Sequence, residues 1–96
     1  MKLLMIICSE SRRDQAAALL EEHGVRAFTE LPEVVGEGAT GKRFGSRVWP
    51  GRSSLLFTVA EDAKIAELIA ALRACRDTLF PGEGMKVFAL PAEEAL

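Results

Sequence analysis

The sequence predicts one α+β domain in which two helices cover one face of a four-stranded antiparallel sheet. Short apolar runs alternate with helix-forming segments in the order strand, helix, strand, strand, helix, strand. The chain has 96 residues, of which 49% are hydrophobic and 27% charged, and this size and composition are typical of one soluble globular domain. We therefore expect a single domain over residues 1–96.

Each expected element rests on a local pattern. Apolar runs too short for typical helices predict strands that are buried on both faces. Ser11 and Asp14 resemble a capping box, and His23-Gly24 supplies a C-terminal cap, so these pairs bound the first helix. Pro32 cannot donate a hydrogen bond to a sheet ladder and places its strand at an edge. The expected elements are strands at 3–8, 25–35, 54–60 and 85–90, and helices at 11–23 and 61–76.

The second helix has the clearest periodicity. Its apolar residues recur at i, i+3, i+4 and i+7, as in a helix with one buried face. They are Ile65, Leu68, Ile69, Leu72 and Cys75. The complete order of elements is the ferredoxin-like βαββαβ arrangement, whose antiparallel sheet has the strand order 4-1-3-2 and carries both helices on one face. Because three of the strands are apolar on both faces, the uncovered face predicts self-association.

A glycine-rich segment, residues 36–52, interrupts this regular pattern. It holds five of the eight glycines and the only tryptophan, and it shows no sustained period. A connection of this length inside a compact domain is usually functional or disordered. Gly36, Gly41 and Lys42 have P-loop spacing, but Arg43 replaces the metal-binding hydroxyl and no helix follows, so we reject a P-loop. Glycines nevertheless let backbone N–H groups approach a phosphate closely.

Three connections fall at the same end of the predicted sheet: residues 9–13, 36–52 and 76–84. Basic residues outnumber acidic ones at this end, whereas acidic residues predominate at the other. A field of this sign concentrates anions, although an ordinary solvated surface is the alternative. The candidate anion-binding residues are Gly36, Gly38, Gly41, Lys42, Arg43, Arg47, Gly82, Glu83, Gly84 and Lys86.

The sequence offers no catalytic or metal-binding constellation. His23, the only histidine, is expected to cap a helix, and no Cys or His spacing suggests a metal site. Cys8 and Cys75 are expected to be small buried hydrophobes. Only Phe57 lies where RNA-binding domains of this fold carry stacking aromatics, so we expect no nucleic-acid partner. We find neither a signal sequence nor a membrane-length segment, which predicts a cytoplasmic protein.

Two segments resemble the P-II signalling family. The glycine-rich segment opens with VVGEG at residues 34–38 and holds the position of the family's T-loop. Residues 82–88, GEGMKVF, are similar to the family's B-loop pattern GDGKIF, with Glu83 in place of Asp and Met85 as an extra residue. The chain departs from classical members because it has no tyrosine, shows no T-loop glutamine and carries no basic C-terminal loop.

This resemblance implies a homotrimer that binds an adenine nucleotide (ATP, ADP, AMP or a cyclic nucleotide) between subunits and needs no obligatory cofactor. It also implies a regulator without catalytic activity, which controls a transporter or enzyme through a mobile T-loop at 36–52. Phe44 and Trp49 are the expected contacts with that partner. Two alternatives remain open: a trimeric metal-binding or metal-tolerance protein of the same fold, and an interaction module that uses Trp49 without a small ligand.

Overall fold

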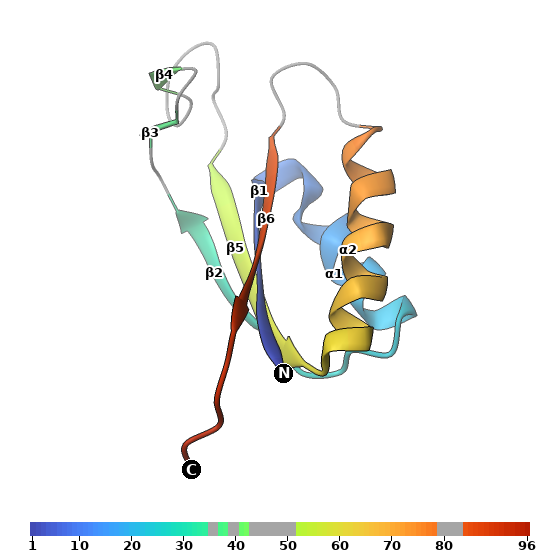
Figure 1. Ribbon diagram of the computed structural model, residues 1–96. Coiled ribbons are helices and arrows are strands. Elements are labelled where there is room, and N and C mark those ends of the chain that lie inside the picture. The colour runs from blue at the N-terminus through green and yellow to red at the C-terminus, as the bar shows by residue number, and fades with distance from the viewer. Residues whose placement is uncertain (35–36, 39–40, 43–51, 79–83) are drawn as a thin grey trace.

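Two helices cover one face of a four-stranded antiparallel sheet (Figure 1). The structure, a computed structural model, describes residues 1–34, 37–38, 41–42, 52–78 and 84–96. The elements are β1 (Lys2–Ser9), a 3-10 turn (Glu10–Arg12), α1 (Arg13–Glu22), β2 (Thr29–Val34), β3 (Glu37–Gly38), β4 (Gly41–Lys42), β5 (Ser53–Ala60), α2 (Asp62–Arg76) and β6 (Met85–Pro91). The four-stranded sheet has the order β2-β5-β1-β6, which confirms the predicted ferredoxin-like arrangement.

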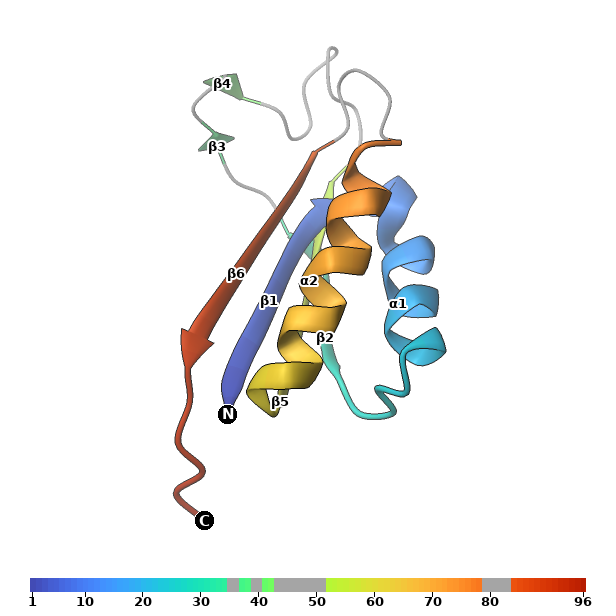
Figure 2. The ribbon, with the colours of Figure 1, turned by 45° about the vertical axis from the view of Figure 1, so that its right-hand side comes forward.

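The inner face of the sheet forms the core together with the two helices, which lie on the same side of the sheet (Figure 2). Alternate residues of β1 point toward the helices, as the period of a strand requires. They pack with one face of each helix, and the predicted apolar stripe of α2 is confirmed. The buried residues of this core include Leu4, Ile6, Cys8, Ala16, Leu20, Leu56, Ile65, Leu68, Leu72 and Cys75.

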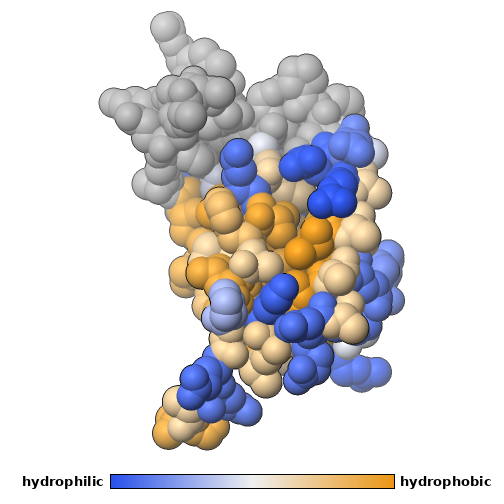
Figure 3. Space-filling view, in the orientation of Figure 1, coloured by the Kyte–Doolittle hydropathy of each residue, from blue (hydrophilic) through white to orange (hydrophobic). Residues whose placement is uncertain are grey.

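The outer face of the sheet is apolar, and neither helix covers it. Met5 of β1 lies opposite Phe57 of β5 and Phe88 of β6, so these three side chains share this face. Phe88 and Leu31 are each 50% exposed, and Val59 and Leu90 are exposed nearly as far. Figure 3 shows apolar side chains along β6 as well as between β6 and α2. Contiguous apolar surface of this kind marks an interaction face, so the structure favours self-association.

The C-terminal end of α1 confirms the cap predicted at His23-Gly24. Gly24 has a φ of 84°. Its N–H donates to the Glu21 carbonyl at 3.0 Å, and the Val25 N–H donates to the Leu20 carbonyl at 2.9 Å. These two hydrogen bonds form a Schellman motif, in which a left-handed glycine ends the helix and the next apolar residue turns back into the core.

Two predictions of helix and strand limits are wrong. Ser11 does not cap α1, because it lies in the 3-10 turn; Arg12 is the N-cap residue and makes no capping hydrogen bond through its side chain. The second strand begins at Thr29 rather than at residue 25. The residues before it connect α1 to the sheet: Val25 is buried in the core, and the Ala27 carbonyl accepts a hydrogen bond from the Thr58 side chain at 2.7 Å instead of one from the ladder. The edge position of the strand that contains Pro32 is confirmed.

The glycine-rich segment contains more regular structure than its sequence predicts. Gly38 of β3 pairs with Gly41 of β4, and Glu37 pairs with Lys42, in a short antiparallel ladder. The expectation of a segment without regular structure is therefore wrong for these four residues. Two glycines therefore lie opposite each other in this ladder, and neither carries a side chain.

The uncovered face gives a first testable prediction. We expect the protein to associate at micromolar concentration and the Phe88→Glu variant to have a lower mass in light scattering, because a carboxylate in an apolar interface must be desolvated. Leu96→Glu, which changes an exposed apolar residue outside the sheet, is the matched control and should leave the mass unchanged. A monomeric native protein, or an unchanged mass for Phe88→Glu, would contradict this prediction.

Candidate functional site

Backbone hydrogen bonds join the chain connections at one end of the sheet. The N–H of Ser9, the last residue of β1, donates to the Gly84 carbonyl at 3.1 Å. The next N–H, of Glu10, donates to the Arg52 carbonyl at 2.7 Å. The end of β1 therefore holds the residue before β5 and the residue before β6 at the same place. The predicted convergence of the three connections is confirmed at these described residues.

The Glu10 carboxylate fixes the points where the chain leaves β2 and enters β5. Its Oε2 accepts hydrogen bonds from Ser54 Oγ at 3.1 Å and from the Glu33 N–H at 3.4 Å. Glu33 has a φ of 56°, which is uncommon for a residue with a side chain. It lies at an irregularity in the pairing of β2 with β5, between Leu31 and Val34. Such irregularities redirect a strand, and here the redirected chain leads into the glycine-rich segment.

Four side chains lie on the outer face near this end of the sheet. Ile7 lies opposite Lys86 of β6, and Ser9 lies opposite Ser53 of β5. Because Ile7 and Ser9 are two residues apart on β1, all four side chains share the outer face. Lys86 is exposed, and no described carboxylate pairs with it, whereas both serines are buried. This corner combines a cation, two hydroxyls and an apolar side chain.

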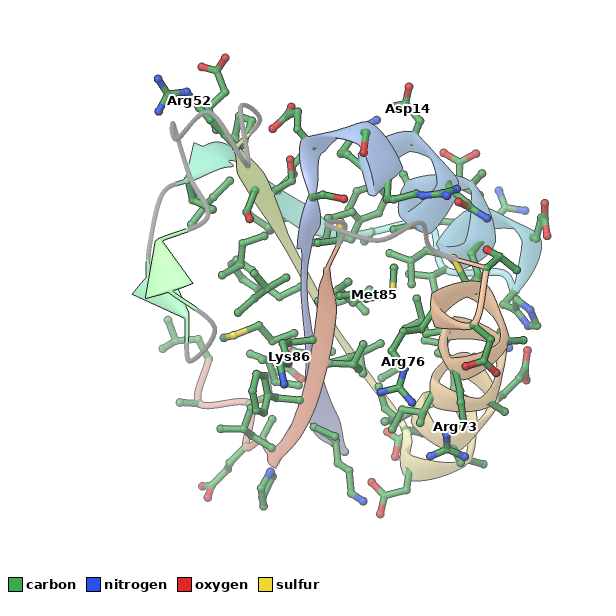
Figure 4. All side chains as sticks on the ribbon, turned by 90° about the horizontal axis from the view of Figure 1, so that it is seen from above. Asp14, Arg52, Arg73, Arg76, Met85 and Lys86 are labelled. Atoms are coloured by element: carbon green, nitrogen blue, oxygen red, sulfur yellow. The ribbon has the colours of Figure 1, made fainter. Side chains whose placement is uncertain are left out.

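A second basic group lies on the helix side of the sheet. Arg73 and Arg76 of α2 border a groove of about 120 Å³ between α2 and β6. The remaining lining residues are apolar: Ile69, Leu72, Met85 and Val87. Viewed from the end where the connections meet, Lys86 lies on one side of β6, and Arg73 and Arg76 lie on the other (Figure 4). The positive charge predicted at this end is thus divided between two faces.

One basic residue of this end is already neutralised. Arg13 donates to the two carboxylate oxygens of Glu30 at 2.6 Å each, and to Asp14 Oδ1 at 2.9 Å. The hydrogen bonds from Arg13 lower the pKa of Glu30. Because two carboxylates pair with it, Arg13 adds little to the net positive charge of this end. Glu30 lies within β2 opposite Leu56, close enough to bind Arg13.

The structure describes only some of the predicted site residues. Gly38, Gly41 and Lys42 belong to the β3–β4 ladder, Gly84 accepts the hydrogen bond from Ser9, and Lys86 lies on the outer face. The others lie outside the described residues, and their roles remain predictions: Gly36, Arg43, Phe44, Arg47, Trp49, Gly82 and Glu83. Sequence reasoning missed Ser9, Glu10 and Ser53. Their signal was their position, since each lies at the end of a strand beside a predicted connection.

Both cysteines are free and buried, as predicted. Burial raises the pKa of the Cys8 thiol to about 11, so this thiol is protonated at neutral pH. Among the described residues, no group of three or more His, Cys, Asp or Glu side chains could hold a metal ion. In the same part of the chain, we find no helix with the length and apolar character needed to cross a membrane.

Comparison with known proteins assigns the chain to a protein family. The sequence profile of the nitrogen regulatory protein P-II family matches residues 1–96, so the chain belongs to this family of signalling proteins. No curated protein sequence matches the chain.

Solved structures of PII-like proteins share its fold. One is CPII, a nitrogen regulatory PII-like protein from Thiomonas intermedia K12, bound to ADP, AMP and bicarbonate. Its sequence is 18% identical to this chain, and the two structures match with a TM-score of 0.70 over 93% of this chain and 84% of CPII. A structure of CPII with ADP, AMP and acetate has 15% identity and a TM-score of 0.70 over 97% and 88% of the two chains. A PII-like signaling protein (TTHA0516) from Thermus thermophilus has 20% identity and a TM-score of 0.65, over 92% of this chain and 82% of its own.

The Glu10 contacts give a second prediction. We expect Glu10→Ala to lower the free energy of unfolding by about 1–3 kcal/mol, because the fully buried Ser54 hydroxyl loses its acceptor. Hydrogen exchange should quicken at the Glu33 and Ser54 amides. Glu22→Ala, an exposed substitution in the last turn of α1, is the control and should change neither quantity. Equal stability and exchange in the two variants would show that Glu10 does not hold these residues.

Proposed function

We propose that this P-II-family chain binds an adenine nucleotide at the end of the sheet where its connections meet, and that it regulates a protein partner through residues 36–52. One observation carries the proposal: the end of β1 holds Arg52 and Gly84 through the N–H groups of Glu10 and Ser9. Arg52 ends the segment that resembles the T-loop, and Gly84 belongs to the one that resembles the B-loop. A ligand at this point would contact both.

The chemistry of the corner suits a nucleotide. Lys86 supplies positive charge for a phosphate, and Ile7 and Leu55, which are paired across β1 and β5, supply an apolar wall for a base. The glycines at 36, 38, 41, 82 and 84 would let backbone N–H groups approach the phosphates. The CPII structures, which contain ADP and AMP, support the nucleotide as the ligand class.

The apolar outer face supports a site between subunits. Lys86 and Phe88 are two residues apart on β6 and therefore point to the same face. A second copy packed on Phe88 would border the corner at Lys86, so assembly would complete the site. We propose a homotrimer, the arrangement implied by the family, in the cytoplasm.

Regulation would follow from the coupling of the ligand to residues 36–52. Glu10 binds two residues that flank or end this segment: its carboxylate accepts from the N–H of Glu33, three residues before Gly36, and its N–H donates to the carbonyl of Arg52. A nucleotide that alters the position of either end would change how Phe44 and Trp49 are presented to a transporter or enzyme. In this proposal the chain works by binding alone, without catalysis and without an obligatory cofactor.

Calorimetry with ATP, ADP, AMP, cyclic AMP and cyclic di-AMP tests the proposal. We expect at least one of them to bind and Lys86→Ala to weaken its affinity about tenfold or more, because a hydrogen bond to a charged group is lost. Arg26→Ala, which removes an exposed cation before β2 at the opposite end of the sheet, is the control and should have little effect. No binding by any of the five at millimolar concentration would contradict the proposal. Equal affinities of the two variants would place the site elsewhere.

A further inference from the structure

The buried hydroxyl groups of the described residues differ in one respect. Four polar residues are buried: Ser9, Ser53, Ser54 and Thr58. Ser54 Oγ donates to Glu10, Thr58 Oγ donates to the Ala27 carbonyl, and Ser9 Oγ lies 3.4 Å from Ser11 Oγ. Ser53, which is 5% exposed, has no hydrogen-bond partner for its hydroxyl among the described residues.

An unpartnered buried hydroxyl is unusual. Removal of a hydroxyl from water without a replacement hydrogen bond disfavours the folded state, and most buried polar atoms in proteins have a partner. Exceptions occur where a bound molecule completes the hydrogen bonding. The position of Ser53, next to Arg52 and at the start of β5, is where the proposed nucleotide site lies.

The register directs Ser53 toward the same corner as Lys86. Ser53 lies opposite Ser9, whereas Ser54 lies opposite the buried Cys8, so the two adjacent serines point to opposite faces of the sheet. Lys86 lies on the far side of β1, opposite Ile7. Neighbouring strands are about 4.8 Å apart, and Ser9 lies two residues beyond Ile7, which is about 7 Å along β1. The backbone positions of Ser53 and Lys86 are therefore separated by about 12 Å diagonally across β1. A lysine side chain can cross much of this distance, so one small anion could contact both residues.

We propose that Ser53 Oγ donates a hydrogen bond to an oxygen of an anion bound on the outer face, with Lys86 supplying the opposite charge. Ser9 Oγ, whose contact with Ser11 is long, is the second donor. This inference rests on the proposed function and adds the side chain that recognises the anion. The recognised group is an oxyanion, which is either the phosphate of a nucleotide or a small free anion such as bicarbonate.

Ser53 and Thr58, two buried residues of β5 with hydroxyl groups, provide a matched pair of variants. We expect Ser53→Ala to weaken binding about tenfold or more in calorimetry with ADP, AMP and bicarbonate, because it removes a hydrogen bond to a charged group. Thr58→Val removes a buried hydroxyl of the same strand on the opposite face, away from this corner, and should leave the affinity unchanged. Ser53→Thr keeps the hydroxyl, is well suited to a strand, and should retain most of the affinity. A loss seen with ADP and AMP alone assigns the oxyanion to the nucleotide, and a loss with bicarbonate alone assigns it to the small anion; both results support the proposal.

The ligand-free protein gives a second readout. Ser53→Ala should not lower the midpoint of thermal unfolding, since the hydroxyl that it removes has no described partner. Ser54→Ala should lower the midpoint, because Ser54 donates to Glu10. If Ser53→Ala lowers the midpoint as much as Ser54→Ala does, another group or a water molecule already satisfies Ser53, and the inference is wrong.

The result also separates this inference from the function on which it rests. If the native protein binds ADP and Ser53→Ala binds it equally well, the nucleotide site stands and the role of Ser53 is refuted. If the native protein binds none of the three probes, both the site and the role of Ser53 are refuted.

Discussion

The site depends on two backbone hydrogen bonds at the end of β1. Because β1 is a central strand, it pairs with β5 on one side and with β6 on the other. The N–H of Ser9, its last residue, donates to the Gly84 carbonyl, and the N–H of Glu10, the next residue, donates to the Arg52 carbonyl. These bonds hold the ends of two glycine-rich segments that are distant in the sequence. Backbone hydrogen bonds do not depend on side-chain identity, so both can form whichever side chains these residues carry.

The two faces of the sheet differ in what covers them. The inner face is buried against both helices and stabilises the fold, so its residues are apolar or small. The outer face is apolar as well, but it ends in Ser9, Ser53 and Lys86 where the connections meet. In the proposed function, one continuous surface would combine an assembly face with an anion-binding corner, and binding and assembly would be coupled. The arginines of the α2–β6 groove lie outside this arrangement.

The fold was predictable because its signals are local. The apolar spacing of α2 and the short apolar runs of the strands are each visible within a few residues, and the order of elements then defines the topology. The contacts of the site depend on register instead. Arg13 binds Glu30, and Glu10 binds Ser54, across chain separations at which sequence patterns carry no information about distance. Even the local capping signal of Ser11 failed, because a 3-10 turn occupies the place of the expected first helical turn.

Chemical-shift mapping of isotopically labelled protein during an ADP titration tests the central claim most directly. The claim is that one ligand acts, through the end of β1, on Arg52 and Gly84, the residues where the two glycine-rich segments join the sheet. The account predicts that the amides of Ser9, Arg52, Ser53 and Gly84 shift together at the same ADP concentration, while Gly24, beyond the opposite end of the sheet, does not. Shifts confined to Arg73 and Arg76, or a shift of only one of Arg52 and Gly84, would contradict it.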